Sequence, residues 1–208
     1  MPEKICGRKI GIMGGTFNPI HNGHLYLAQT ALTQAALDTV VFMPSGQSYM
    51  KADTGVLSGD IRLDMVKEAI AGNPSLTFSD MEIKRAGNTY TYETLTILKE
   101  AYPDDTFYFI VGADSLFSME NWKKPEEIFD KCIILAAVRD DMDKVSMQKK
   151  VSDLQEKFGA VIQLLEFPKT DISSCFIRQQ LALEKDISHL VPEKVKNYIN
   201  EHKLYQKK

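Results

Sequence analysis

The sequence predicts an α/β protein with a doubly wound parallel sheet. Short apolar and β-branched runs alternate along the 208 residues with longer segments whose apolar residues recur every three or four positions. The runs are almost continuously apolar, as in strands that helices cover on both faces. Glycines and polar residues follow several of these runs. Because ligands of such sheets bind beyond the carboxyl ends of the strands, we expect the functional residues at that edge.

The first half of the chain contains two strong strand signals, each followed by a helix. Residues 8–13 form the first apolar run, and residues 39–43 form a second that is rich in β-branched side chains. Apolar residues at helical spacing follow over residues 22–36 and 60–71. Asp60 is the expected N-cap of the second helix, because its carboxylate can accept hydrogen bonds from the free N–H groups there.

The second half repeats this alternation. Residues 76–83 alternate roughly as a strand, and residues 91–101 have a helical pattern. We expect further strands at residues 106–111, 132–138 and 161–167, and further helices at 125–131, 145–158, 174–183 and 192–202. No internal repeat or Pro-, Gly- or Ser-rich linker divides the chain. We therefore expect a single domain over residues 1–208, with a small C-terminal helical part at about 173–208.

Composition limits the classes of function. The net charge of −3 argues against a large nucleic-acid-binding face, although it leaves room for a small anion site. The N-terminal residues lack the apolar run of a signal peptide, and no stretch is apolar for long enough to span a membrane. Cys6, Cys132 and Cys175 have no paired metal-ligand or disulfide spacing. We expect a cytoplasmic protein that binds neither nucleic acid nor membrane.

The segment from Gly14 to Leu25 is the strongest candidate site. It lies between the first predicted strand and a helix that begins near Asn22, and this order of elements favours binding of an anion. Glycines allow backbone N–H groups to approach a phosphate, and the helix N-terminus is positive. His21 would lie just before the helix and His24 in its first turn, so both rings can face one pocket. Two exposed histidines at a helix start are the alternative.

Residues 172–178 form a second candidate for the same edge of the sheet. Asp171 or Ser173 can cap the helix predicted there, and the serines offer hydroxyl and N–H groups. Arg178 lies one turn further on, and its forked guanidinium suits a phosphate. A capped amphipathic helix with an exposed arginine would explain these residues alone. Together with the first site, however, they indicate a polyphosphate held from two sides.

These motifs resemble those of the bacterial nicotinate mononucleotide adenylyltransferases, within the His-x-Gly-His nucleotidylyltransferase superfamily. The family pattern Gly-Gly-Thr-Phe-Asp-Pro-x-His-x-Gly-His-Leu is matched over residues 14–25, with Asn18 in place of Asp. The pattern Ile/Val-Ser-Ser-Thr-x-Ile-Arg is matched over residues 172–178, with Cys175 in place of Thr. The family ending is matched by Pro192, Val195, Tyr198, Ile199, Leu204 and Tyr205. The resemblance covers nearly the whole chain.

The resemblance implies a Rossmann-like fold and an activity in NAD biosynthesis. AMP would be transferred from ATP to nicotinate mononucleotide, giving nicotinate adenine dinucleotide (deamido-NAD) and pyrophosphate. Direct in-line attack needs no enzyme nucleophile, because the acceptor phosphate is already anionic. Mg²⁺ would be carried by the ATP phosphates, without protein ligands. The residues implied to be catalytic are His21, His24 and Arg178. Those implied to bind ATP are Gly14, Gly15, Thr16, Phe17, Gly23, Ser173, Ser174, Ile177 and Arg139.

The resemblance also implies an acceptor site. Trp122, the only tryptophan, would stack on the pyridine ring, although a lone tryptophan is most often a packing residue. Thr91, in a segment similar to the family's Ser-Tyr-Thr-x-Asp/Glu-Thr, would lie near the substrate carboxylate. The remaining residues expected to bind the substrate are Gly112, Asp114 and Lys51. The family's carboxylate is read largely by backbone N–H groups, so a preference for nicotinate over nicotinamide is left open, as is a homo-oligomeric state.

Three departures from the family pattern concern basic residues. The family's His-Lys, His-Arg and Arg-Pro-Gly become Met50-Lys51, Ile61-Arg62 and Arg139-Asp140-Asp141. Phosphate contact, support of the site and plain surface charge are alternatives for Lys51, Arg62 and Arg139. Two rival functions are another superfamily activity, on phosphopantetheine or with CTP, and a regulatory nucleotide-binding module without catalysis. The Trp122 segment argues against the first rival, and intact His21, His24 and Arg178 argue against the second.

Overall fold

Six parallel strands form the centre of the computed structural model, which describes residues 7–46, 55–139, 144–168 and 170–206. Their order in the sheet is β3-β2-β1-β4-β5-β6, so the direction of winding reverses between β1 and β4. The strands are β1 (Lys9–Gly15), β2 (Thr39–Pro44), β3 (Leu76–Phe78), β4 (Thr106–Gly112), β5 (Ile133–Arg139) and β6 (Ile162–Phe167). The doubly wound parallel sheet expected from the sequence is confirmed.

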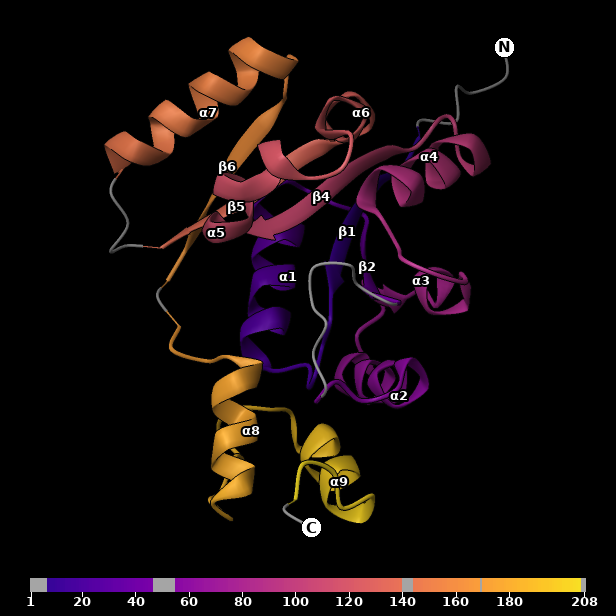
Figure 1. Cartoon of the computed structure of the whole chain (residues 1–208), viewed down its shortest axis with the longest axis vertical. Helices are drawn as coiled ribbons and strands as arrows, with labels where there is room; N and C mark the ends of the chain where they lie inside the picture. Colours follow the sequence, from indigo (N-terminus) through magenta and orange to yellow (C-terminus); the bar gives the residue numbers. More distant parts are fainter. Residues whose placement is uncertain (1–6, 47–54, 140–143, 169, 207–208) are drawn as a thin grey trace.

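Helices cover both faces of the sheet (Figure 1). On one face lie α1 (Asn22–Gln34) and α2 (Gly59–Ile70), and on the other lie α4 (Thr91–Ala101), α5 (Ala113–Ser118), α6 (Pro125–Lys131) and α7 (Lys144–Phe158). Helices α8 (Ser174–Ala182) and α9 (Glu193–Glu201) lie beyond the end of the sheet, and their buried residues belong to the cluster of the α1 face. Two short elements, α3 (Met81–Lys84) and the 3₁₀ turn η1 (Met119–Asn121), lie in connections. Ile12 and Met13 are both buried, but in different clusters, because successive strand residues point to opposite faces.

Several predicted boundaries are wrong, for local reasons. Helix α2 is capped by Ser58, whose hydroxyl accepts a hydrogen bond from the backbone N–H of Ile61, and Asp60 lies inside the first turn. The expected strand over residues 76–83 ends at Phe78 because its next residues turn into α3. Strand β1 extends to Gly15, so both glycines belong to the sheet. The sequence pattern missed α5, whose six residues are too few to show helical periodicity.

The C-terminal helices cover the beginning of α1. Ile177, Val195 and Ile199 are almost fully buried in the same cluster as the apolar face of α1. The backbone N–H of Asn22 donates to the carbonyl of Leu190 over 2.9 Å. The α8–α9 segment is therefore packed against the end of the sheet where the candidate site lies. No helix in the described part of the chain is both long and apolar enough to cross a bilayer.

Candidate active site

Residues 14–21, which comprise the end of β1 and the connection to α1 and are called the first loop below, place two histidine rings against each other. His21 is the N-cap of α1 and His24 lies in its first turn, as the sequence indicates. Their ring centroids are 3.7 Å apart and the rings are stacked. Phe17, with a positive φ of 49°, meets the His24 ring edge to face at 5.0 Å and is almost fully buried. The packing of Phe17 against the His24 ring therefore holds that ring in place.

The backbone determines which nitrogen of His24 carries the proton. The N–H of His21 donates to Nδ1 of His24 over 3.2 Å, so a neutral His24 ring carries its proton on Nε2 and can donate from there. Burial is the main reason that the pKa of His24 lies well below its usual value, and the neighbouring His21 adds to the effect. Burial also lowers the pKa of His21 from 6.5 to about 4. Both rings are neutral near pH 7 in the free protein.

The buried His21 ring is expected to destabilise the protein as the pH falls. The ring is protonated near pH 6.5 in the unfolded chain but only near pH 4 in the folded protein. Below pH 6.5 the unfolded state therefore binds more protons, and the free energy of unfolding falls. From about pH 7 to about pH 4.5 we expect an additional loss of about 2 to 3 kcal/mol relative to His21→Asn. Urea unfolding of both proteins measures the difference; equal losses would contradict it.

Two glycines next to the histidines lie where a side chain would fit only tightly. A Cβ at Gly23 would lie 3.1 Å from Nδ1 of His21 and 3.2 Å from Cε1 of the same ring. A Cβ at Gly15 would lie 3.0 Å from the Phe17 ring. At Gly14 the nearest atom would be 3.6 Å away, on the Phe109 ring, so this position is less restricted. The glycines at 15 and 23 thus allow the two supporting rings to pack closely.

The side chain of Asn18 joins the first loop to two other segments and explains one departure from the family pattern. Its side chain is buried, and Nδ2 donates to the carbonyl of Gly55 over 3.1 Å. Its Oδ1 accepts from the backbone N–H of Leu57 and, over 2.8 Å, from the hydroxyl of Tyr205. An aspartate could not donate to Gly55, so asparagine is the matching residue for this arrangement. The C-terminal Tyr205 is thereby tied to the first loop.

Arg62 holds together three segments of backbone around the site. It is 3% exposed, and its guanidinium donates to three backbone carbonyls: Thr16 over 2.6 Å, Ser45 over 2.7 Å and Leu57 over 3.0 Å. These carbonyls belong to the first loop, the residue that follows β2 and the segment before α2. Burial lowers the pKa of Arg62. Of the alternatives considered for Arg62, support of the loops therefore fits the geometry.

Helix α8 brings the second candidate segment to the first loop. Ser173 caps the helix by accepting from the backbone N–H of Phe176 over 3.1 Å, which decides between Ser173 and Asp171. Ser174 Oγ donates to the carbonyl of Pro19 over 2.8 Å, and Arg178 Nη1 donates to the carbonyl of Asn18 over 2.8 Å. The two segments expected to hold one polyphosphate therefore lie in direct contact, although they are far apart in sequence.

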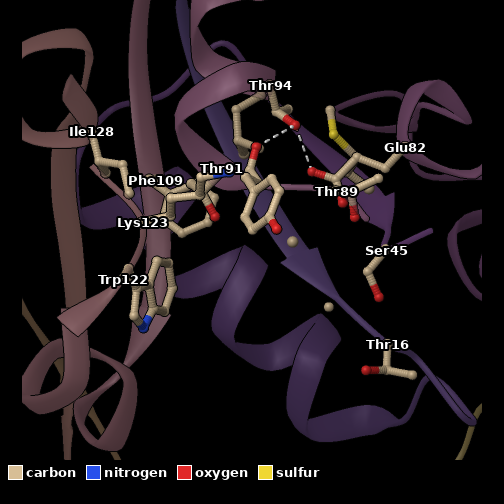
Figure 2. A pocket seen from close by; sticks show the side chains of 15 residues that line it. Thr16, Ser45, Glu82, Thr89, Thr91, Thr94, Phe109, Trp122, Lys123 and Ile128 are labelled. Carbon is tan, nitrogen blue, oxygen red and sulfur yellow. Dashed lines mark hydrogen bonds between the residues drawn. The ribbon is translucent and has the colours of Figure 1, made fainter. Parts of the chain in front are cut away.

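A cavity of about 230 Å³ begins at the first loop and extends over the sheet to Trp122 (Figure 2). Gly14, Gly15 and Thr16 line one end of it. Trp122 donates from Nε1 to Ser118 Oγ over 3.3 Å and meets Phe109 edge to face at 6.2 Å, so its ring is held in place. The other lining residues include Ile12, Met43, Ser45, Glu82, Thr89, Tyr90, Thr91, Thr94, Phe109, Lys123 and Ile128.

Some expected site residues lie elsewhere. Ile177 is fully buried and its N–H donates to the Ser173 carbonyl, so its side chain packs in the core and is not available to ATP. Gly112 and Asp114 are exposed at the start of α5, and neither lines the cavity. Lys51, like Met50 beside it, lies outside the described residues. Arg139 ends β5, but its side chain lies outside the described part of the structure.

Sequence reasoning missed several cavity residues. Ser45 follows β2 directly and could have been found from the rule that sites lie at strand ends. Glu82 was not recognised as a cavity residue, because the strand predicted over residues 76–83 leaves no loop at that position. Lys123 directly follows Trp122, and this adjacency is the sequence signal that could have found it. Asn18 was noted as a departure, but its contacts span up to 187 residues and leave no sequence signal.

Comparisons with known proteins agree with this arrangement. The family profile described as Cytidylyltransferase-like matches residues 12–180. A relative from Lachnoclostridium phytofermentans, named as a nicotinate-nucleotide adenylyltransferase, is 44% identical over 95% of this chain and 99% of its own length. A relative of the same name from Dehalococcoides mccartyi is 42% identical over 96% of this chain and 98% of its own length.

A solved structure shows the same fold. The Plasmodium falciparum nicotinic acid mononucleotide adenylyltransferase, complexed with NaAD, superimposes with a TM-score of 0.79 at 23% identity, covering 95% of this chain and 97% of that one. The predicted Rossmann-like fold is thus confirmed. The full-length relatives at more than 40% identity confirm the predicted family and the assignment as a nucleotidyltransferase. The chain belongs to the nicotinate-nucleotide adenylyltransferase family.

Proposed function

We propose that the protein transfers AMP from ATP to nicotinate mononucleotide in a single in-line step, giving nicotinate adenine dinucleotide and pyrophosphate. The observation that carries this proposal is the cavity that joins the first loop to Trp122. At one end lie Gly14, Gly15 and Thr16, and the loop that they begin leads to His21, His24 and the N-terminus of α1, which suit phosphates but do not themselves line the cavity. At the other end, the ring of Trp122 offers a flat apolar face to an aromatic base. A dinucleotide product needs both ends at once.

The chemistry follows from the groups around the first loop. An oxygen of the mononucleotide phosphate attacks the α-phosphorus of ATP, a new P–O bond forms, and the bond to the β-phosphate oxygen breaks with its electron pair going to pyrophosphate. Negative charge therefore gathers on the leaving group, where donors lower the barrier. His24 can donate from Nε2, and His21 stacks beside it. Arg178 and the N-terminus of α8 would hold the outer phosphates from the other side.

The divalent cation is proposed to enter with the nucleotide. The described residues contain no group of three or more His, Cys, Asp or Glu side chains that could hold a metal ion. Mg²⁺ coordinated by the ATP phosphates would neutralise part of their charge. The donors supplied by the protein are neutral imidazoles, an arginine and backbone N–H groups. This donor set suits phosphate oxygens and leaves metal coordination to the substrate.

A substrate panel tests the proposed function. We expect purified protein with ATP and MgCl₂ to convert nicotinate mononucleotide far faster than nicotinamide mononucleotide, with formation of the dinucleotide followed by chromatography. Equal rates would contradict the choice of acceptor. Conversion of phosphopantetheine in place of either mononucleotide would move the protein to the rival activity. Absence of product with every acceptor, despite ATP binding, would support the regulatory module.

A further inference from the structure

Two side chains of opposite charge line the cavity near Trp122. Figure 2 shows Lys123 on the same side of the cavity as Trp122 and Phe109, whereas Glu82 lies on the other side, near Thr89. Lys123 immediately follows Trp122, so its position is coupled to that of the stacking ring. A lysine and an aromatic ring therefore line the same side of the cavity.

Lys123 is held without a carboxylate partner in the described part of the chain. Its ammonium lies 3.9 Å from the centroid of the Tyr90 ring and 5.9 Å from that of Tyr92, in cation–π contacts. Lys124, the next residue, differs: its ammonium forms a 2.7 Å ion pair with Glu127, and it does not line the cavity. Of the two adjacent lysines, only Lys123 lines the cavity, and among the described residues its ammonium contacts aromatic rings in place of a carboxylate.

The carboxylate of Glu82 is hydrogen-bonded to another residue that lines the cavity. Its Oε1 accepts a hydrogen bond from Thr94 Oγ1 over 2.7 Å, and the same hydroxyl oxygen accepts from Arg85 Nη2 over 3.2 Å. Glu82 and Thr94 therefore belong to one hydrogen-bonded chain with Arg85, in which Nε and Nη1 of Arg85 have no hydrogen-bond partner among the residues that the structure describes. The carboxylate of Glu82 would repel an anionic substituent, so a negative group on the base should turn toward the Lys123 side.

The two candidate acceptors differ in one substituent. Both bases carry the same cationic pyridinium ring, so stacking on Trp122 attracts them about equally. Nicotinate adds a carboxylate, and nicotinamide adds a neutral amide. We propose that Lys123 is the specificity-determining residue that pairs with the nicotinate carboxylate. This inference rests on the proposed function and extends it to the choice between the two mononucleotides.

The test compares Lys123→Met with Lys124→Met as the matched control. Both variants lose one positive charge, and methionine keeps most of the side-chain stem. We expect Lys123→Met to lower the ratio of kcat/KM for nicotinate mononucleotide to kcat/KM for nicotinamide mononucleotide by roughly tenfold. The value for nicotinate mononucleotide should fall, and the value for nicotinamide mononucleotide should stay unchanged. Lys124→Met should keep the wild-type ratio. Lys123→Arg, which retains the charge, should recover most of the preference.

Each other outcome overturns a distinct claim. A wild-type preference that survives in Lys123→Met shows that Lys123 does not read the carboxylate, while the proposed function stands. An equal loss with both mononucleotides shows that Lys123 acts on the structure of the cavity and not on the choice of base. A wild-type enzyme without preference contradicts the proposed function itself, and the role of Lys123 falls with it.

Discussion

Replacing His24 by alanine is expected to lower kcat by about 10²- to 10³-fold, the usual cost of removing one donor to a developing anion. The Nε2–H group of His24 is available because Nδ1 accepts the backbone N–H of His21. Alanine removes both functions, whereas the core beneath the ring, including Phe17, is retained. Steady-state kinetics at saturating ATP and acceptor measure the effect. Unchanged turnover would remove His24 from the mechanism.

Two further variants separate the functions of the His24 ring. In His24→Asn the side-chain oxygen can replace Nδ1 as the acceptor for the backbone N–H of His21, but no donor remains at the Nε2 position. In His24→Gln the amide nitrogen can approach the position of Nε2. If donation to the leaving group matters, the glutamine variant keeps more activity than the asparagine variant. The reverse order would assign His24 to holding the first loop. Thermal unfolding of each variant shows whether the fold is intact.

Replacing Arg62 by methionine is expected to lower the free energy of unfolding by about 2 to 4 kcal/mol, because three backbone carbonyls lose the donor that this buried guanidinium supplies. These carbonyls, of Thr16, Ser45 and Leu57, come from three separate segments around the site. KM for ATP should also rise, since the first loop, which is proposed to contact the ATP phosphates, is no longer held in place. Urea unfolding and kinetics at varied ATP concentration measure the two effects.

Arg62→Lys distinguishes geometry from charge. Lysine restores the positive charge, but one ammonium group cannot reach three carbonyls that are placed around a planar fork. We expect this variant to recover only a small part of the lost stability and of the affinity for ATP. Full recovery by lysine would show that the charge alone is needed. An unfolding free energy of Arg62→Met that equals the wild-type value would contradict the supporting role altogether.

The strongest local patterns predicted their elements well. The bounds of α4 and α6 match the expected residues 91–101 and 125–131, because apolar spacing and, for α6, a proline at the first helical position are local signals. The strand expected over residues 76–83 begins where β3 does, but its end at Phe78 and the turn into α3 were not predicted, since three extended residues have too little pattern to mark an end. Ser58 and Asp60 are both good caps, and only the path of the chain selects between them.

In the candidate site, too, the local motifs could be predicted from the sequence and the contacts between distant segments could not. The first loop and residues 172–178 were recognisable as candidates because chemistry and spacing lie within a few consecutive residues. Their contact with each other, through Arg178 and the carbonyl of Asn18, joins residues 160 positions apart. Tyr205 reaches Asn18 across 187 positions. The parallel sheet brings such segments together because the carboxyl ends of its strands meet at one edge.

The sequence alone thus determined which chemical groups stand at the strand ends: two histidines, a pair of serines, several basic residues and one tryptophan. The tertiary structure decided which of these groups are used internally and which are available to a ligand. The guanidinium of Arg62 donates hydrogen bonds to three backbone carbonyls, and Lys124 forms an ion pair with Glu127. Lys123, in contrast, lines the cavity. A hydrogen-bond partner is chosen by proximity in space, and for distant segments that proximity exists only once the chain has folded.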